Sequence, residues 1–331
     1  MVRDSVTGHL TLDRLLEDFL HHLEVDKGRR PATLLRYAGL QQNWISPHLG
    51  AKRADRILPN DIDSVLGRLR QAGQSQSSIH QTFTLLNGAF KWARRNRRVP
   101  SNPCAEVEEP HSSTPAREVL PPELETVHQL VEAAFDLEFG FGVACYLAAV
   151  TGMRRGEICG LRWPQVHLDK GYLVVAATVS DVGGRTTVNE FTKTRKTRRV
   201  SIDGRCAELL TQLRTEAEHN AATAETALVV DGFVFTHSIS GDAPVRPELF
   251  SRRMARLRRR LGMEHAEFDT TMHALRHWTQ TTLSEAGYNS RQVALRGGHS
   301  EQLMNRVYVH RTNTAERQMT DYLGDLLNPI G

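Results

Sequence analysis

The chain has 331 residues, of which 40% are hydrophobic and 24% are charged, close to the usual mix of a soluble globular protein. This length suggests about two domains, each able to bury its own core. No run approaches the roughly 20 apolar residues that a membrane span needs. We therefore expect no membrane partner and, because the N-terminus lacks an apolar signal region, a cytoplasmic protein.

The four cysteines lie far apart and include no CxxC pair. They predict neither a disulfide framework nor a zinc site, which agrees with a reducing compartment. Two of them, Cys145 and Cys159, fall in apolar stretches and are expected to be small core residues.

The net charge is only +4, so its distribution matters more than its size. Lysine and arginine are concentrated in three short blocks, residues 94–98, 193–199 and 252–260. Any one block is explained equally well by a solvated helix face. Three blocks in one chain favour a polyanion such as nucleic acid as the partner.

The first hundred residues predict short amphipathic helices and no strand. Apolar residues recur at the spacing of one helix face in three places. These are Leu12, Leu15, Leu16 and Phe19; Ile62, Val65, Leu66 and Leu69; and Ile79, Phe83, Leu86 and Phe90. Thr11 is a candidate N-cap for the first helix, and a turn over residues 73–78 precedes the third. The third helix is expected to run on towards Pro100 through Arg94, Arg95, Arg97 and Arg98. We expect residues 1–110 to form a helical domain with one basic end.

Proline and small polar residues are dense over residues 111–122, which predicts a linker. The second domain, residues 123–331, opens with an apolar helical stretch that we expect to reach Val150.

Strands follow that helix. Residues rich in β-branched side chains predict one small antiparallel sheet, broken at Gly183-Gly184, with strands over residues 172–179, 186–191 and 198–202. From Arg205 the pattern is helical again, and a stripe of Met254, Leu257 and Leu261 leaves Arg253, Arg256 and Arg260 on the outer face. The fold class expected is mainly α with a small antiparallel β-sheet in the second domain.

Four short elements of the second domain carry residues suited to phosphate chemistry. The first, residues 151–157 (TGMRRGE), closes the apolar helix with a glycine that lets the chain turn while Arg154 projects. Arginine suits a phosphate because its planar fork donates two parallel hydrogen bonds and keeps its charge. A purely structural arginine paired with Glu157 explains this motif alone equally well.

The other three elements are weaker when taken singly. His273 and Arg276 are spaced to share one helix face, but that spacing is common by chance. Gly297-Gly298-His299 is followed nine residues later by Tyr308, and a lone tyrosine is more often a packing residue. Lys193 ends a predicted strand, where a solvated basic hairpin is the commoner explanation.

Together and in this order, the elements resemble the tyrosine recombinase (phage integrase) family. The resemblance covers nearly the whole chain: TGxRxGE followed by LxW, a KT turn before a basic strand, HxLRH, GGHS and the later tyrosine. Ala274, where Asp is frequent, and Gly297, where Leu often precedes GH, depart from the common pattern without touching a catalytic position. The resemblance implies a helical core-DNA-binding domain followed by an α+β catalytic domain.

The resemblance also implies how the reaction proceeds. Tyr308 would attack the scissile phosphorus to give a 3′-phosphotyrosine and a free 5′-hydroxyl. Because a phenol has a pKa of about 10, it must lose its proton, and His273 is the implied general base. Arg154 and Arg276 would hold the non-bridging oxygens and stabilise the transition state.

The remaining residues have supporting roles in the same scheme. Lys193 is the implied acid for the departing 5′-oxygen, with Lys196 as the alternative. His299 would hydrogen-bond the same phosphate, and Glu157 would brace the active-site fold. Because the protein–DNA bond conserves the phosphodiester energy, we expect no ATP. Two arginines and a lysine supply positive charge at the phosphate, so we also expect no catalytic metal and no other cofactor.

The implied partner is double-stranded DNA with a specific recombination site. A homotetramer is expected on DNA and a monomer in its absence, with an excisionase or host factor as an accessory partner. The expected DNA clamp, mostly to phosphates, comprises Arg94, Arg95, Arg97 and Arg98 and also Arg253, Arg256 and Arg260. The apolar tail either docks on a neighbour or folds on its own core, through Tyr322, Leu323, Leu326 and Leu327.

Four alternatives remain open from the sequence. A type IB topoisomerase would use similar chemistry to relax supercoils, and a catalytically silent DNA-binding protein could keep the same scaffold. Within recombinases, the Gly183-Gly184 hairpin favours a mobile-element integrase over a chromosome-dimer resolvase or an inversion switch. The chain starts directly at the core-binding module, which weakens the case for an integrase with a separate arm-binding domain, although a truncated chain would look the same.

Overall fold

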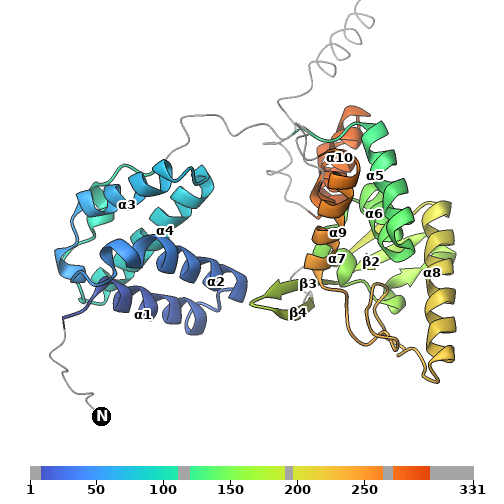
Figure 1. Ribbon diagram of the computed structural model, residues 1–331, viewed down its shortest axis with the longest axis horizontal. Helices are drawn as coiled ribbons and strands as arrows, with labels where there is room; N and C mark the ends of the chain where they lie inside the picture. Colours follow the sequence, from blue (N-terminus) through green and yellow to red (C-terminus); the bar gives the residue numbers. More distant parts are fainter. Residues whose placement is uncertain (1–8, 111–119, 191–196, 264–270, 299–331) are drawn as a thin grey trace, which may run out of the picture. The chain divides into compact units, whose positions relative to one another are not determined.

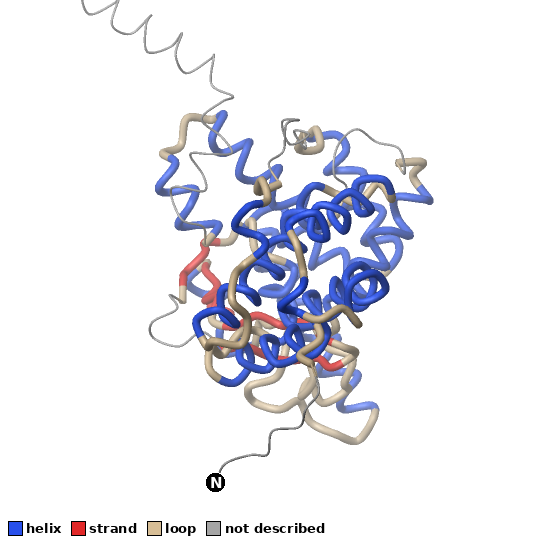
Figure 2. Tube along the Cα trace, turned by 90° about the vertical axis from the view of Figure 1, so that its left-hand side faces the viewer, coloured by secondary structure: helices blue, strands red, loops and turns tan. Residues whose placement is uncertain are grey.

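The computed structural model describes residues 9–110, 120–190, 197–263 and 271–298. Helices make up most of the described chain, and its strands are short (Figure 2). The chain divides into two units, residues 1–118 and 119–331 (Figure 1). The predicted fold class, mainly α with a small antiparallel β-sheet in the second domain, is confirmed, although the strands divide into two sheets.

The first unit is a set of helices that buries the three predicted apolar stripes. α1 (Leu12–Val25), α3 (Pro59–Gln71) and α4 (Gln76–Arg95) carry these stripes, and every residue in them is buried. Both α1 and α3 pack on α4. The chain between them adds α2 (Pro31–Leu40), the π-helical η1 (Gln41–Gly50) and the short η2 (Ala54–Arg56), and η3 (Pro103–Glu106) follows α4.

Capping residues decide where these helices begin and end. The hydroxyl of Thr11 accepts a hydrogen bond from the backbone N of Arg14 at 3.3 Å, so Thr11 is the N-cap of α1 as predicted. Ser75 caps α4, which therefore begins at Gln76, inside the expected turn. α4 ends at Arg95 rather than near Pro100, and Arg97 beyond it has a left-handed φ of 55°.

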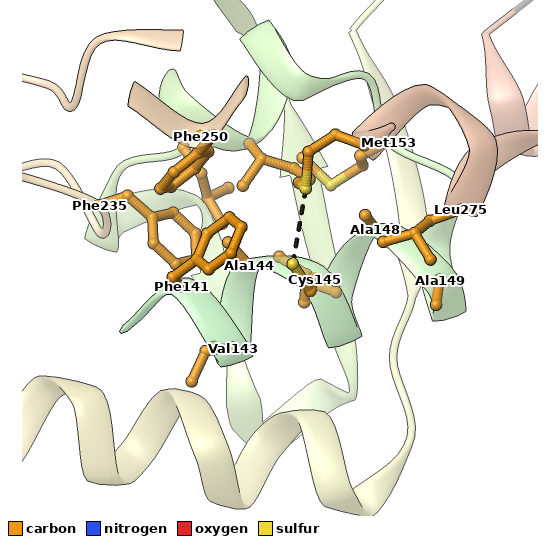
Figure 3. Packing of buried hydrophobic residues seen from close by; sticks show 14 of the residues in the cluster. Phe141, Val143, Ala144, Cys145, Ala148, Ala149, Met153, Phe235, Phe250 and Leu275 are labelled. Carbon is orange, nitrogen blue, oxygen red and sulfur yellow. Dashed lines mark hydrogen bonds between the residues drawn. The ribbon is translucent and has the colours of Figure 1, made fainter. Parts of the chain in front are cut away.

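The second unit is organised around α6 (Phe139–Thr151), which is apolar on nearly all sides and correspondingly buried. It contacts α5 (Leu124–Leu137), α7 (Arg155–Cys159), α8 (Gly204–Thr223) and α10 (Met272–Glu285). Figure 3 shows Phe141 of α6 packed against Phe250 of α9 (Pro247–Arg260), with ring centroids 5.5 Å apart. The thiol of Cys145 donates to the sulfur of Met272 at 3.6 Å, and α11 (Ser290–Gly297) packs on α10.

The prediction of one helix reaching Val150 was wrong, because α5 and α6 are separated at Glu138. The backbone of Glu138 is extended, with φ −169° and ψ 129°. Its carboxylate pairs with Arg253 of α9. Gly142 on α6 leaves room for Phe135 of α5. Apolar residues continue across the break, so their spacing could not show it.

The strands form two sheets rather than the single predicted sheet. One is three-stranded and antiparallel in the order β1-β2-β5, comprising β1 (Val166–His167), β2 (Tyr172–Val175) and β5 (Arg198–Ser201). The other is a hairpin of β3 (Ala177–Val182) and β4 (Arg185–Glu190), closed by Gly183-Gly184. The strand predicted over 172–179 is therefore divided between two sheets. Two short turns, η4 (Trp163–Gln165) and η5 (Leu168–Lys170), flank β1.

All four cysteines are buried and unbridged, and Cys145 and Cys159 lie in the main core as expected. Within the described ranges, the helices are too short or too polar to cross a membrane.

We predict that Gly142→Ala destabilises the second unit, whereas Gly140→Ala in the same helix does not. A Cβ atom at Gly142 would lie 2.8 Å from the Cα atom of Phe135, and such overpacking costs about 1–3 kcal/mol. A Cβ atom at Gly140 would meet Leu213 at 3.7 Å, so the variant gains helix propensity of up to about 1 kcal/mol. Thermal unfolding measures both effects. Equal melting temperatures for the two variants would contradict the observed packing of α5 on α6.

Candidate active site

Arg154 stands at the turn that joins α6 to α7. Gly152 caps α6 with a left-handed φ of 65°, and its N–H donates to the carbonyl oxygen of Ala148 at 3.0 Å. The backbone is then extended at Arg154, with φ −71° and ψ 147°, before α7 begins. The glycine therefore makes the predicted turn, and the side chain of Arg154 remains 41% exposed.

Arg276 is tied to the same turn from α10. Its side chain is almost fully buried, and its Nη1 atom donates to the carbonyl oxygen of Gly152. One turn further along α10, the hydroxyl of Thr279 donates to the carbonyl oxygen of Ala149 at 2.6 Å. These bonds fasten α10 to the end of α6. They bring Arg154 and Arg276, far apart in sequence, to one place.

His273 lies one turn before Arg276, at the start of α10. Thr271 caps this helix, because its hydroxyl accepts from the backbone N of His273 at 3.1 Å. The imidazole is exposed and meets His277 edge-on, with ring centroids 4.6 Å apart.

A hollow of roughly 510 Å³ is lined by residues from α7, α9 and the start of α10. Arg154, Arg155, Arg258 and His273 contribute to its wall, and no carboxylate does so in the described part of the chain. Arg155 donates to the hydroxyl of Ser251 on α9. A wall rich in cations and lacking acids concentrates positive potential, which suits a phosphate group.

The carboxylate of Glu157 binds two arginines while being only 3% exposed. Oε1 accepts from Nη1 of Arg154 at 3.0 Å, and Oε2 accepts from the backbone N of Arg154 at 2.8 Å. Arg198 of β5 donates through both Nη atoms, at 3.1 and 2.7 Å. Burial acts to raise the pKa of Glu157, but the bonds and charge of Arg198, together with those of Arg154, hold this pKa below its usual value. The buried, charged carboxylate therefore fixes the positions of both guanidinium groups.

Both arginines also contact the C-terminus of α11. Nη2 of Arg154 donates to the carbonyl oxygen of Gly298 at 2.8 Å, and its Nη1 lies 3.4 Å from that of Gly297. Nε of Arg198 donates to the carbonyl oxygen of Arg296 at 2.8 Å. Carbonyls at a helix C-terminus carry partial negative charge, so the two guanidinium groups stabilise this end. Gly298 has a left-handed φ of 68°, and a Cβ atom there would lie 2.9 Å from Cζ of Arg198.

Four predicted residues lie outside the described residues: Lys193, its alternative Lys196, His299 and Tyr308. In sequence, both lysines belong to the segment between β4 and β5, and His299 directly follows Gly298. The described part of the chain contains no group of three His, Cys, Asp or Glu side chains placed to hold a metal ion.

The arginines predicted to contact DNA differ in exposure. The exposed ones are Arg94, Arg95, Arg97, Arg256 and Arg260. Arg98 is half-buried, because it pairs with Asp18 at 2.6 Å and lies over the ring of Trp92. Arg253 does not face outwards as expected. It pairs with Glu138 and lies over the ring of Phe141, and its partner belongs to the helix break that the sequence pattern did not show.

Sequence reasoning missed Arg198, the second partner of Glu157. Side chains alternate along a strand, so Arg198 shares the face of Val200, which is buried. The sequence signal for an inward-facing Arg198 is its position two residues before a core valine on the same strand. The surrounding basic block obscures this signal because it predicts a solvated surface.

Glu157→Gln is expected to lower stability near neutral pH by about 3 kcal/mol, because Arg198 loses its buried counter-charge. The pKa of Glu157 in the folded protein lies below its usual value of 4.5. Its contribution is therefore complete above pH 4.5 and is lost as the pH falls through the folded pKa. Denaturant unfolding of both proteins, from neutral pH to about pH 3, measures this loss. A stability difference that stays constant over that range would show that the pKa of Glu157 is the same in the folded and the unfolded protein.

Two family models match the chain. The N-terminal SAM-like domain of phage integrases matches residues 16–97, and the phage integrase family matches residues 124–315. Two relatives are similar over nearly the full chain. A tyrosine recombinase XerC-like protein of Caldanaerobacter subterraneus is 26% identical, covering 96% of this chain and 83% of its own length. The ICEBs1 integrase of Bacillus subtilis is 24% identical, covering 95% of this chain and 82% of its own length.

Solved structures share the fold at lower identity. The integrase of the Tn1549 transposon, in complex with a circular intermediate DNA, gives a TM-score of 0.77 at 18% identity, covering 95% of this chain and all of that one. A lambda integrase dimer bound to a core site gives 0.67 at 19% identity, covering 92% of this chain and 97% of that one. Since the phage integrase model alone matches more than half of the residues, the chain belongs to the phage integrase family of tyrosine recombinases.

Proposed function

We propose that this protein is a site-specific DNA recombinase that cleaves and rejoins DNA through a 3′-phosphotyrosine at Tyr308. Family membership supports the class of activity. The observation that carries the proposal is the cationic hollow lined by Arg154 and His273. Arg276 is bonded to Gly152, in the turn that positions Arg154. These groups can bind a phosphate and move a proton without a metal ion.

In the cleavage step, the oxygen of Tyr308 forms a bond to the scissile phosphorus while the bond to the 5′-oxygen breaks. His273, exposed at the wall of the hollow, takes the phenol proton. Arg154 and Arg276 hold the non-bridging oxygens, on which negative charge accumulates in the transition state.

The proton balance is completed by residues outside the described part of the chain. Lys193, with Lys196 as the alternative, gives a proton to the departing 5′-oxygen, and His299 hydrogen-bonds the same phosphate. In the rejoining step, a 5′-hydroxyl attacks the phosphotyrosine and restores a phosphodiester. One ester replaces another at each step, so no ATP is consumed.

The test is a nicked duplex that carries the candidate attachment site beside the gene, so that a short fragment leaves after cleavage and the covalent complex accumulates. We expect a covalent protein–DNA band in EDTA that Tyr308→Phe abolishes and the tail control Tyr322→Phe retains. Arg154→Ala is expected to slow its formation by a factor of about 10²–10³, as the loss of one transition-state donor does.

Two outcomes of this test oppose the proposal. Tight binding to the site without a band would indicate a catalytically silent DNA-binding protein. A band that requires Mg²⁺ and persists in Tyr308→Phe would mean that the nucleophile and the class of enzyme are both different.

We also propose a DNA-contact surface on the first unit, at the end of α4 and the loop after α1. A hollow of roughly 530 Å³ there is lined by five cations, Lys27, Arg29, Lys91, Arg94 and Arg95. Phe19, His22 and Trp92 also line it, and the rings of His22 and Trp92 stack at 5.3 Å. Five exposed cations gathered around one hollow support contacts to DNA phosphates. Arg98, already paired with Asp18, is assigned to the support of Trp92 instead.

Arg95→Ala is expected to weaken binding to specific and non-specific duplexes alike. The slope of log K against log salt should fall by about 1, because one phosphate contact is lost. Arg70→Ala removes a comparable exposed cation at the end of α3 and is the matched control. Fluorescence anisotropy at several salt concentrations measures the slopes. If Arg95→Ala keeps the wild-type slope, Arg95 does not contact DNA.

We further propose that the biological role is recombination of a mobile element by four protomers on DNA, with an excisionase or host factor setting direction. The β3–β4 hairpin and the similarity to the Tn1549 and ICEBs1 integrases support this role. Lambda integrase has been solved as a tetramer on a Holliday junction. The relatives named XerC-like and XerD keep chromosome-dimer resolution as the second candidate. Excision of a circle from a plasmid that carries the repeats flanking the gene would support the first role.

A further inference from the structure

We propose that Arg198 is a positioning residue of the recombinase, which keeps the charge of Arg154 available for the DNA phosphate. This inference rests on the proposed function. It concerns the buried group formed by Glu157, Arg154 and Arg198, called here the Glu157 clamp.

Arg198 joins three segments through one planar group. Both of its Nη atoms bind the carboxylate of Glu157 on α7, and its Nε atom binds the carbonyl oxygen of Arg296 on α11. The side chain is 12% exposed. Arg198 itself begins β5. Three hydrogen bonds from one rigid fork fix the orientation of all three segments.

Each of these segments lies close in the chain to a predicted active-site residue. Arg154 is the N-cap residue directly before α7, and Glu157 binds both its backbone and its side chain. The end of α11 leads directly into His299, and β5 follows the segment that contains Lys193. A displacement of Arg198 would therefore reach Arg154 through Glu157, together with the ends of the two segments that adjoin the predicted residues Lys193 and His299.

The charge of the Glu157 clamp gives Arg198 a second effect. Two arginines share one carboxylate, which leaves a single net positive charge. Without Arg198, the buried carboxylate would have Arg154 as its remaining partner within the Glu157 clamp, and their charges would cancel. Arg154 would then offer the phosphate little electrostatic stabilisation. Arg198 neutralises Glu157 so that the charge of Arg154 remains for the substrate.

This charge balance predicts an unusual pattern in single-turnover cleavage of the nicked duplex. Arg198→Gln is expected to slow formation of the covalent complex by a factor of about 100, as removal of one preorganised donor does. Affinity for the site should be unchanged. Adding Glu157→Gln to Arg198→Gln removes the competing carboxylate, so the double variant should recover at least about tenfold of the lost rate. A purely structural clamp predicts the opposite, because the second substitution would only damage it further.

Arg162→Gln is the matched control, because it removes a structural arginine elsewhere in the same unit. Arg162 pairs with Asp231 at 3.3 Å and lies 3.9 Å from the ring centroid of Phe233, contacts that do not involve the Glu157 clamp. This variant should lose stability but keep the cleavage rate of its folded fraction. If Arg198→Gln does not fold, Arg198→Lys replaces it. Lysine keeps the charge but loses the fork, so we expect an intermediate rate.

Several results would overturn the inference. Arg198 is not a positioning residue if Arg198→Gln, or its replacement Arg198→Lys, cleaves at the wild-type rate. The same holds if the double variant is slower than Arg198→Gln, or if affinity falls in parallel with the rate. If the wild-type protein forms no covalent complex through Tyr308, the proposed function is refuted and this inference with it. The wild-type result therefore separates a failure of the proposed function from a failure of the inference about Arg198.

Discussion

A carboxylate buried between two guanidinium groups is the interaction on which the candidate site depends. Glu157 would be costly to bury alone, because a charge removed from water needs both a partner and hydrogen bonds. Arg154 and Arg198 supply both, and in return Glu157 determines where each guanidinium lies. Arg154 and Arg198 also bind the C-terminus of α11. One charged group therefore holds α7, β5 and α11, each of which lies close in the chain to a predicted catalytic position.

Helix C-termini explain why so many arginines converge here. α6 and α11 both end close to Arg154, and the last carbonyl groups of a helix have no partner within it. Arg276 donates to Gly152 and Arg296 donates to Val150 at the end of α6, while Arg154 and Arg198 bind the end of α11. Carbonyl oxygens are weaker acceptors for arginine than a phosphate is. The arginines are thus held in place by groups with which a DNA phosphate can compete.

The sequence predicted this architecture where one local pattern determines the outcome. The apolar stripes of α1, α3 and α4 and the turn at Gly152 were all predicted, because periodicity and a single glycine suffice for them. The break at Glu138, the division of the strands into two sheets and the inward pairing of Arg253 depend on contacts between distant segments. Arg198 was missed for a different reason, because the basic block around it predicts a solvated surface. The structure brings Arg154, His273 and Arg276 together, while Lys193, His299 and Tyr308 stay predictions.

The two cationic hollows differ in how their arginines are held, which fits the proposed roles of DNA binding for the first hollow and catalysis for the second. In the first unit, the cations Lys27, Arg29, Lys91, Arg94 and Arg95 are exposed. Such side chains keep their rotamer freedom and attract DNA mainly by releasing counterions, which makes binding strong but dependent on salt. In the second unit, Arg154 and Arg276 are bonded to carbonyl groups or to a buried carboxylate before DNA arrives. These two side chains are already in position when DNA binds, so little energy is spent on moving them. Their charge can therefore stabilise the proposed transition state. The proposed recombinase would need both arrangements. Exposed cations give affinity for DNA of any sequence, whereas preorganised cations stabilise the transition state at one phosphate.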